Sequence, residues 1–232
     1  MNVYLFDIDG TLMLSGGAGL RSMNRVFFER YGLHDAFDGF QFQGKVDPAI
    51  FREALLLHDI KVADPDAEIP AMIREYESYI AAEMPHSHTA TVYPGVRELL
   101  ERLGGRSDLS IGLLTGNVRG GAFAKLSYFD LWKFFPYGAF GSDHEQREKL
   151  VPIALERASR HLGRTIEPGP HVYVIGDTDR DVACALANDC TAVGVGTLNF
   201  SAARLKALGA HLVFEDFSDT ENVLKQLGVN HG

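Results

Sequence analysis

Two pairs of aspartates stand at the ends of apolar runs in this sequence. Asp7 and Asp9 lie at the end of the first run, and Asp177 and Asp181 follow the run at residues 172–176. Ionised carboxylates that lie close together repel one another unless a cation lies between them. Oxygen ligands with room left for water and a phosphate oxygen suit Mg²⁺. The four aspartates therefore predict a magnesium site, provided that the two runs form neighbouring strands.

A third apolar run, at residues 109–115, leads into Thr115, Gly116 and Asn117. The Thr115 hydroxyl and the backbone N–H groups of the next two residues would lie at a helix N-terminus. Such a terminus attracts anions because its N–H groups are unpaired and carry the positive end of the helix dipole. The segment predicts a phosphate-binding loop, with an ordinary strand-to-helix turn as the alternative.

Apolar runs alternate with helical patterns through most of the chain. This order is typical of a parallel sheet covered by helices, so the predicted fold class is α/β. Ligands of such sheets bind at the carboxyl ends of the strands, where the residues above lie. The expected strands are residues 3–8, 109–115, 137–140, 172–176 and 191–195, with 212–214 as a sixth candidate. The expected helices are residues 123–131, 147–162, 181–188, 202–208 and 220–227.

The alternation breaks between residues 15 and 91, where the pattern is helical throughout. Asp47 is expected to act as the N-cap of a helix, with Pro48 at its first position. The simplest arrangement is a discontinuous sheet domain with a helical domain inserted after the first strand. The predicted boundaries place residues 1–14 and 92–232 in the sheet domain and residues 15–91 in the helical domain.

Composition limits the classes of partner. The 232 residues are 46% hydrophobic and carry 22 Lys and Arg against 31 Asp and Glu, a net charge of −9. This balance argues against nucleic acid or an anionic membrane surface as the main partner, but a small anionic substrate remains compatible with a bound metal. No window reaches the roughly 18 apolar residues that a membrane span needs. With two cysteines, Cys184 and Cys190, and no basic segment leading into an apolar run near the start, we expect a cytoplasmic protein.

Taken together and in this order, the motifs resemble those of the haloacid dehalogenase-like hydrolases. They are DIDGT at residues 7–11, LLTGN at 113–117, a basic helix start near 147, and GDTDRD at 176–181. The chain looks like the phosphatase branch with a helical cap after the first strand, similar to phosphoglycolate phosphatases and β-phosphoglucomutases. The resemblance implies a Rossmann-like parallel sheet with an inserted α-helical cap domain.

The resemblance also implies roles for the aspartates. Asp7 would be the nucleophile that attacks phosphorus and forms an aspartyl-phosphate, which water then hydrolyses. Asp9 would protonate the leaving alkoxide and then activate that water, and its backbone carbonyl would bind the metal. Asp177 would complete the Mg²⁺ site, and Asp181 would hold metal-bound waters or a nearby cation.

In this family a Lys or Arg precedes the last motif and lies beside the nucleophile and the phosphate. Arg147 and Lys149 compete for this position. Arg147 shares a helical face with Leu150, Ala154 and Ala158, which would point to the sheet, whereas Lys149 lies off that face. We favour Arg147 as the catalytic cation and keep Lys149 as the alternative phosphate ligand.

The cap offers a hint about the substrate. Gly44 and Lys45 lie in a loop that, in capped relatives, reaches into the cleft and contacts the substrate beyond the phosphate. Lys45 could pair with a carboxylate, as in phosphoglycolate, and a solvated lysine is the equal alternative. The leading hypothesis is a Mg²⁺-dependent phosphomonoester hydrolase for a small phosphorylated metabolite, acting as a monomer or homodimer. A phosphomutase and a non-catalytic regulator that binds a phosphorylated ligand are the alternatives.

Overall fold

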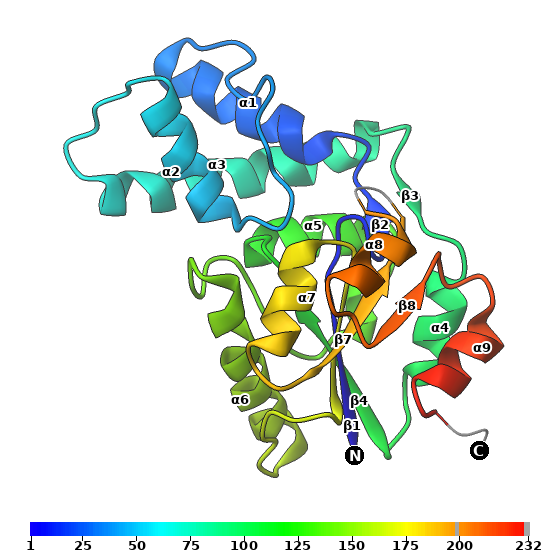
Figure 1. Cartoon of the computed structure of the whole chain (residues 1–232). Helices are drawn as coiled ribbons and strands as arrows, with labels where there is room; N and C mark the ends of the chain where they lie inside the picture. Colours follow the sequence, from blue (N-terminus) through cyan, green and yellow to red (C-terminus); the bar gives the residue numbers. More distant parts are fainter. Residues whose placement is uncertain (198–199, 230–232) are drawn as a thin grey trace.

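A six-stranded, fully parallel sheet forms the centre of the protein (Figure 1). The structure, a computed structural model, describes residues 1–197 and 200–229. Neighbouring strands follow the order β5-β4-β1-β6-β7-β8. This confirms the predicted α/β class, and 212–214 does form a sixth strand. The strands are β1 (Asn2–Phe6), β4 (Leu109–Leu114), β5 (Gly138–Ala139), β6 (Val172–Gly176), β7 (Thr191–Val195) and β8 (Leu212–Phe214).

Helices cover both faces of the sheet because the side chains of a strand alternate between its two faces. Tyr4 and Phe6 of β1 belong to a buried cluster with α4, α5 and α9, whereas Val3 and Leu5 belong to a second cluster with α6, α7 and α8. Strand β1 is therefore buried on both sides, as its continuous apolar sequence predicts. The helices are α4 (Val96–Leu103), α5 (Arg119–Tyr128), α6 (Leu150–Leu162), α7 (Asp179–Leu186), α8 (Ala202–Ala207) and α9 (Thr220–Gln226).

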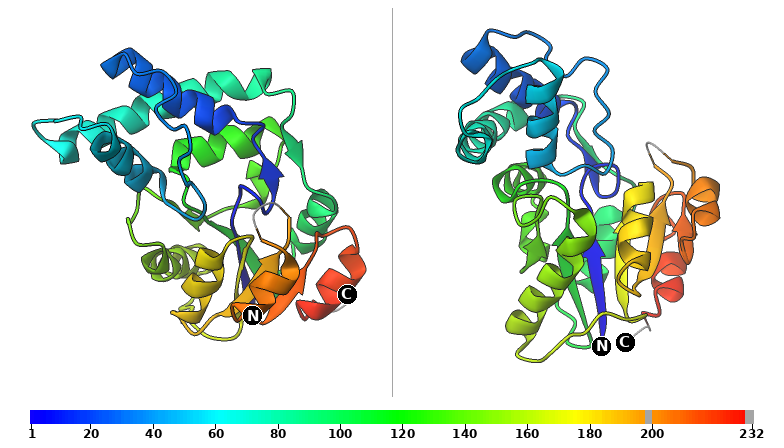
Figure 2. Two further views of the ribbon diagram at one scale, coloured as in Figure 1. Left: turned by 45° about the horizontal axis from the view of Figure 1, so that its top comes forward. Right: turned by 60° about the vertical axis from the view of Figure 1, so that its left-hand side comes forward.

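Three further helices form a cap over one end of the sheet (Figures 1 and 2). They pack on a core of aromatic rings, in which Phe27 contacts Phe37 and Phe51 at ring-centroid distances of 5.0 and 6.3 Å. The cap is α-helical, as predicted, and its third helix lies against α5. The division into domains at residues 14/15 and 91/92 stays a prediction. The cap helices are α1 (Ala18–Tyr31), α2 (Asp47–Leu57) and α3 (Pro65–Glu83).

A short antiparallel ladder joins the two connections between sheet and cap. Strands β2 (Met13–Leu14) and β3 (Thr91–Val92) pair through two residues each. The sequence did not predict this ladder, because two residues are too few to show the alternation that marks a strand. The pairing brings the outgoing and returning chains side by side at the entrance to the cap.

Three helix starts differ from the prediction. Helix α5 begins at residue 119 instead of 123, α7 begins at 179 instead of 181, and a 3-10 turn at Arg147–Lys149 precedes α6, which begins at 150. The expectation that Asp47 caps α2 was wrong: Val46 is the N-cap, and its side chain makes no capping hydrogen bond.

Two smaller findings concern the cysteines and the membrane. Cys184 and Cys190 are both buried free thiols. Within residues 1–197 and 200–229, no helix is long and apolar enough to cross a membrane.

Candidate active site

A cavity of about 290 Å³ lies between the cap and the carboxyl ends of the central strands. Asp7, Asp9 and Arg147 line it from the core, and Lys45 and Tyr76 line it from the cap. Strand β1 lies between β4 and β6, so the loops that follow these three strands meet around the first residues after β1. The aspartates and the segment Thr115–Asn117 singled out in the sequence follow these three strands, with Asp181 in the first turn of α7.

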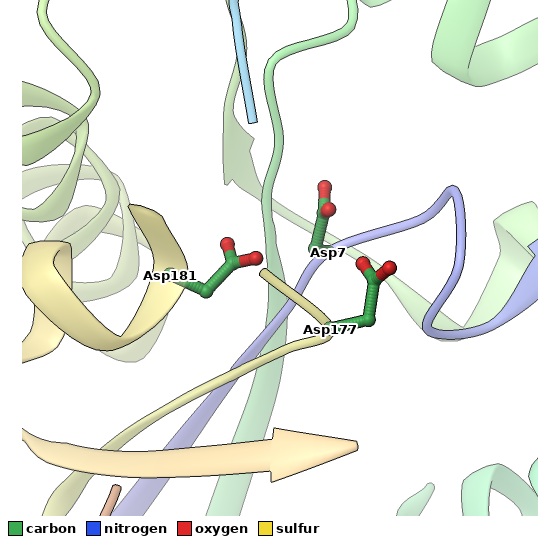
Figure 3. A group of neighbouring side chains, drawn as sticks. All are labelled: Asp7, Asp177 and Asp181. Atoms are coloured by element: carbon green, nitrogen blue, oxygen red, sulfur yellow. The ribbon is translucent and has the colours of Figure 1, made fainter. Parts of the chain in front are cut away.

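Three aspartates converge beside this cavity (Figure 3), and one of them, Asp7, lines it. Asp7, Asp177 and Asp181 each offer a carboxylate oxygen, and these atoms lie within 4.8 Å of one another. All three side chains are buried. Gly10 makes room for Asp177: its φ of 81° favours glycine, and a Cβ there would collide with the Asp177 carboxylate. The group can hold a hard divalent cation, because carboxylates packed this closely need positive charge between them.

Arg147 is the cation that touches two of these acids. Its Nη2 lies 3.2 Å from Asp7 Oδ2 and 2.5 Å from Asp181 Oδ1. Asp181 is also held by Thr178, whose backbone N–H and hydroxyl donate to its second oxygen at 3.1 and 2.6 Å. The buried Nε of Arg147 has no hydrogen-bond partner within the described part of the chain. Lys149, by contrast, is exposed and does not line the cavity.

Burial sets the protonation behaviour of Asp7. It raises the pKa of Asp7 above its ordinary value, to about 6, although the nearby Arg147 opposes this rise and Asp181 adds to it. A divalent cation among the three aspartates would lower this pKa, because positive charge favours the ionised form.

The loop after β4 carries a hydrogen-bond network centred on Asn117. Its side-chain amide donates to Thr115 Oγ1 at 2.9 Å and to Asp9 Oδ2 at 2.8 Å. Gly116 lies against the cap, since a Cβ there would collide with the carbonyl oxygen of Lys45. The structure therefore places Asn117 against both Thr115 and Asp9, in the loop that leads into α5.

Asp9 lies apart from the three converging aspartates. Its side chain is 38% exposed, and Lys125 Nζ donates to its Oδ2 at 2.6 Å. The same ammonium donates to Asn117 Oδ1 at 2.6 Å. Lys125 is buried, lines the cavity, and was missed in the sequence. A signal was present, because Lys125 shares the buried face of α5 with Gly121, Ala122 and Leu126 at helical spacing.

Asp47 was also missed as a contact between cap and core. Its Oδ2 accepts a hydrogen bond from the Val118 N–H at 2.8 Å, and its own N–H donates to the Gly116 carbonyl at 2.9 Å. Asp47 thus caps helix α5 of the core, although it begins helix α2 of the cap. Burial raises the pKa of Asp47 to about 7, against the lowering effects of Lys125 and the Val118 N–H.

The two cap residues predicted to contact the substrate both lie at the cavity. Lys45 Nζ forms an ion pair with Glu53 at 2.6 Å and lies 4.5 Å from the centre of the Phe40 ring. Gly44 has a φ of 65° and lies against the side chain of Arg180. The positive charge of Lys45 is therefore compensated within the cap.

The chain is similar to known proteins over most of its length. The sequence pattern of the haloacid dehalogenase-like hydrolases matches residues 4–195. A phosphoglycolate phosphatase from Chromobacterium violaceum is 29% identical over 224 residues, which make up 95% of each chain.

Two solved structures share the fold at low sequence identity. A predicted phosphatase from Clostridium acetobutylicum has a TM-score of 0.70 and 21% identity, covering 97% of this chain and 99% of its own. A β-phosphoglucomutase from Clostridium difficile has a TM-score of 0.72 and 16% identity, covering 98% and 97%. Because the family pattern spans most of the sequence, the chain belongs to the haloacid dehalogenase-like hydrolases.

Proposed function

We propose that the chain is a Mg²⁺-dependent phosphomonoester hydrolase that acts on a small phosphorylated metabolite through an aspartyl-phosphate. One observation carries this proposal. Asp7, directly after the interior strand β1, belongs to a buried group of three carboxylates and also lies 3.2 Å from the Arg147 guanidinium. A nucleophilic carboxylate, a cation site and a phosphate-binding cation therefore meet in one cavity.

The residues present fit a magnesium ion. Asp7, Asp177 and Asp181 supply carboxylate oxygens within 4.8 Å of one another, and Arg147 contacts two of the three, Asp7 and Asp181. When bound, Mg²⁺ supplies positive charge between the Asp7 carboxylate and the phosphate. Asp9 is proposed to add its backbone carbonyl, while its side chain faces the leaving group.

Arg147 is proposed to orient both the nucleophile and the phosphate. Its Nη2 contacts Asp7, and its buried Nε has no partner within the described residues. An unpaired buried N–H group costs about 1–3 kcal/mol, so a phosphate oxygen that accepts from it would relieve this cost. The position of Lys149 on the surface supports the choice of Arg147 over Lys149.

Thr115 and Gly116 are proposed to bind the remaining phosphate oxygens, one through its hydroxyl and the other through its backbone N–H. Asn117 holds the Thr115 hydroxyl in place through its side chain. The N–H groups at the start of α5 carry partial positive charge, which stabilises negative charge as it develops on the phosphate.

Asp9 is proposed to act as the general acid and then as the general base. Lys125 and Asn117 both donate to its Oδ2, and its Oδ1 has no hydrogen-bond partner among the described residues. The two donors fix the plane of the carboxyl group, so that Oδ1 can give a proton to the leaving alkoxide and later take one from water.

The test is phosphate release from a panel of small phosphomonoesters, 2-phosphoglycolate among them, with Mg²⁺ and with excess EDTA. The proposal predicts phosphate release only with Mg²⁺. Equal rates in EDTA would contradict the proposed metal requirement, and no release from any ester would contradict hydrolysis. Incubation with a hexose 1-phosphate distinguishes a phosphomutase, which would form an isomeric phosphate instead of free phosphate.

A further inference from the structure

Tyr76 presents a buried polar group to the cavity. It lies on α3 of the cap, its side chain is fully buried, and its ring packs edge-on against Phe51 at 5.9 Å. Tyr76 lines the cavity, and its buried hydroxyl has no hydrogen-bond partner within the described part of the chain. Leaving a buried hydroxyl unpaired costs about 1–3 kcal/mol, so we expect the missing partner to come from a ligand.

Gly19 leaves a space beside this hydroxyl. A Cβ on Gly19 would lie 3.6 Å from Tyr76 Oη and 3.8 Å from Lys125 Nζ. These are ordinary contact distances, and Gly19 lies in the first turn of α1, where alanine is favoured. Because Gly19 has no side chain, room is left between the Tyr76 hydroxyl of the cap and the Lys125 ammonium of the core. Because Lys125 also binds Asp9, this space lies beside the proposed acid and base.

The charges around the space disfavour a carboxylate as its occupant. Each cation that lines the cavity is already ion-paired: Lys45 with Glu53, Lys125 with Asp9, and Arg147 with Asp7 and Asp181. The further buried acid Asp47 also lines the cavity. A desolvated carboxylate needs a cation that is not already compensated, whereas a neutral hydroxyl needs only a hydrogen-bond partner.

We propose that Tyr76 determines specificity by donating a hydrogen bond to a neutral, hydroxyl-bearing leaving group, held between Gly19, Tyr76 and Lys125. This inference rests on the proposed phosphomonoester hydrolysis and narrows its substrates to phosphate esters of small polyols or sugars. The cavity of about 290 Å³ is at the lower end of the ligand-pocket range, which agrees with a small substrate.

The test compares kcat/KM for three kinds of ester: hydroxylated (glycerol 3-phosphate and erythrose 4-phosphate), carboxylated (2-phosphoglycolate) and minimal (methyl phosphate). The wild type should prefer at least one hydroxylated ester by tenfold or more over the other two kinds. Tyr76→Phe should reduce this preference about tenfold, mainly through KM, and leave methyl phosphate within twofold. Tyr79→Phe is the matched control, because Tyr79 lies on the same helix but outside the cavity. It should leave kcat/KM unchanged for both the hydroxylated ester and methyl phosphate.

Gly19→Ala provides a second, independent variant. Its methyl group would fill the space between Tyr76 and Lys125 without strain, so the variant should fold normally and lose the same preference. A result in which Gly19→Ala keeps the full preference for the hydroxylated ester would contradict the subsite.

Besides that result, three outcomes would overturn the inference while leaving the proposed hydrolysis intact. The first is a wild-type preference for 2-phosphoglycolate, and the second is an unchanged preference for the hydroxylated ester in Tyr76→Phe. The third is a Tyr76→Phe variant that loses kcat/KM equally for methyl phosphate and for the hydroxylated ester, which would indicate a structural role for Tyr76. A wild-type protein that releases phosphate from none of the esters would instead contradict the proposed function itself.

Discussion

The carboxylate of Asp47 and the backbone N–H of Val118 join the cap to the core through a 2.8 Å hydrogen bond. Asp47 begins helix α2 of the cap, and Val118 is the N-cap residue of α5 in the core. The Asp47 N–H also donates to the Gly116 carbonyl at 2.9 Å. The cap therefore contacts the core directly at the proposed phosphate-binding loop, through a buried group that can change its charge.

Replacing Asp47 with Asn should stabilise the protein increasingly as the pH rises from 5 to 8. Burial raises the pKa of Asp47 from 3.8 to about 7, so the folded state binds the proton more tightly than the unfolded state. The wild type therefore loses stability as the pH rises from about 4 to 7, whereas the variant does not, because the Asn side chain stays neutral. The difference in unfolding free energy between variant and wild type should grow by about 2–3 kcal/mol from pH 5 to pH 8.

Urea unfolding of both proteins at the two pH values measures this difference directly. The comparison at each pH cancels the titration of the other groups, because they are the same in both proteins. If the difference in unfolding free energy between the two proteins does not change with pH, the titration of Asp47 does not affect stability in this range.

Replacing Lys125 with Met should lower kcat by tenfold or more. The substitution removes the donor that holds Asp9 and Asn117 and keeps most of the apolar stem. Asn117 Oδ1 would lose this partner, which also costs about 1–3 kcal/mol of stability. Lys133→Met is the control, because Lys133 forms an exposed ion pair with Asp130. Wild-type kcat and stability in Lys125→Met would rule out the proposed positioning of Asp9.

Arg147 and Lys149 should respond very differently to substitution. Arg147→Gln removes the charge that lies between Asp7 and Asp181, so we expect turnover to fall at least a hundredfold. Lys149→Ala changes an exposed side chain, and its effect on stability should stay within about 0.5 kcal/mol, with kcat unchanged. Steady-state rates of the two variants decide between the cations. A large loss of turnover in Lys149→Ala, with little loss in Arg147→Gln, would instead make Lys149 the cation that acts on the phosphate.

Glu53→Gln tests whether Lys45 can contact the substrate. The substitution removes the partner of Lys45, so its ammonium becomes available to an anionic leaving group. The KM for 2-phosphoglycolate should fall a few-fold, in line with the 0.2–1 kcal/mol of an exposed ion pair. The KM for methyl phosphate should not change. Unchanged KM values for both esters would place Lys45 outside the substrate's reach.

The central strands could be predicted because they are buried on both faces. Strands β1, β4, β6 and β7 are almost wholly buried and rich in apolar residues. The residues that follow β1, β4 and β6 carry the aspartates and the proposed phosphate-binding loop. The two-residue strands β2 and β3 could not be predicted, because so short a pairing depends on the meeting of distant segments.

Lys125 and Asp47 show what local patterns leave out: helical spacing can place Lys125 on a buried face, but it does not say which residues Lys125 or Asp47 contacts. A lysine on a helix and an aspartate before a proline have ordinary local explanations, namely a solvated side chain and an N-cap. Their contacts, with Asp9 and with Val118, lie 116 and 71 residues away in the sequence. Only the packing of the cap and α5 against the sheet brings these pairs together.

The most direct test of the account is the initial rate of Mg²⁺-dependent phosphate release by Asp7→Asn, measured beside the wild type on the best ester of the panel. Asn has nearly the same shape but is not an ionised nucleophile, so thermal unfolding should show an intact fold. The account predicts a rate at least about a thousandfold below that of the wild type. A folded Asp7→Asn protein with a rate within tenfold of the wild type would contradict the aspartyl-phosphate mechanism.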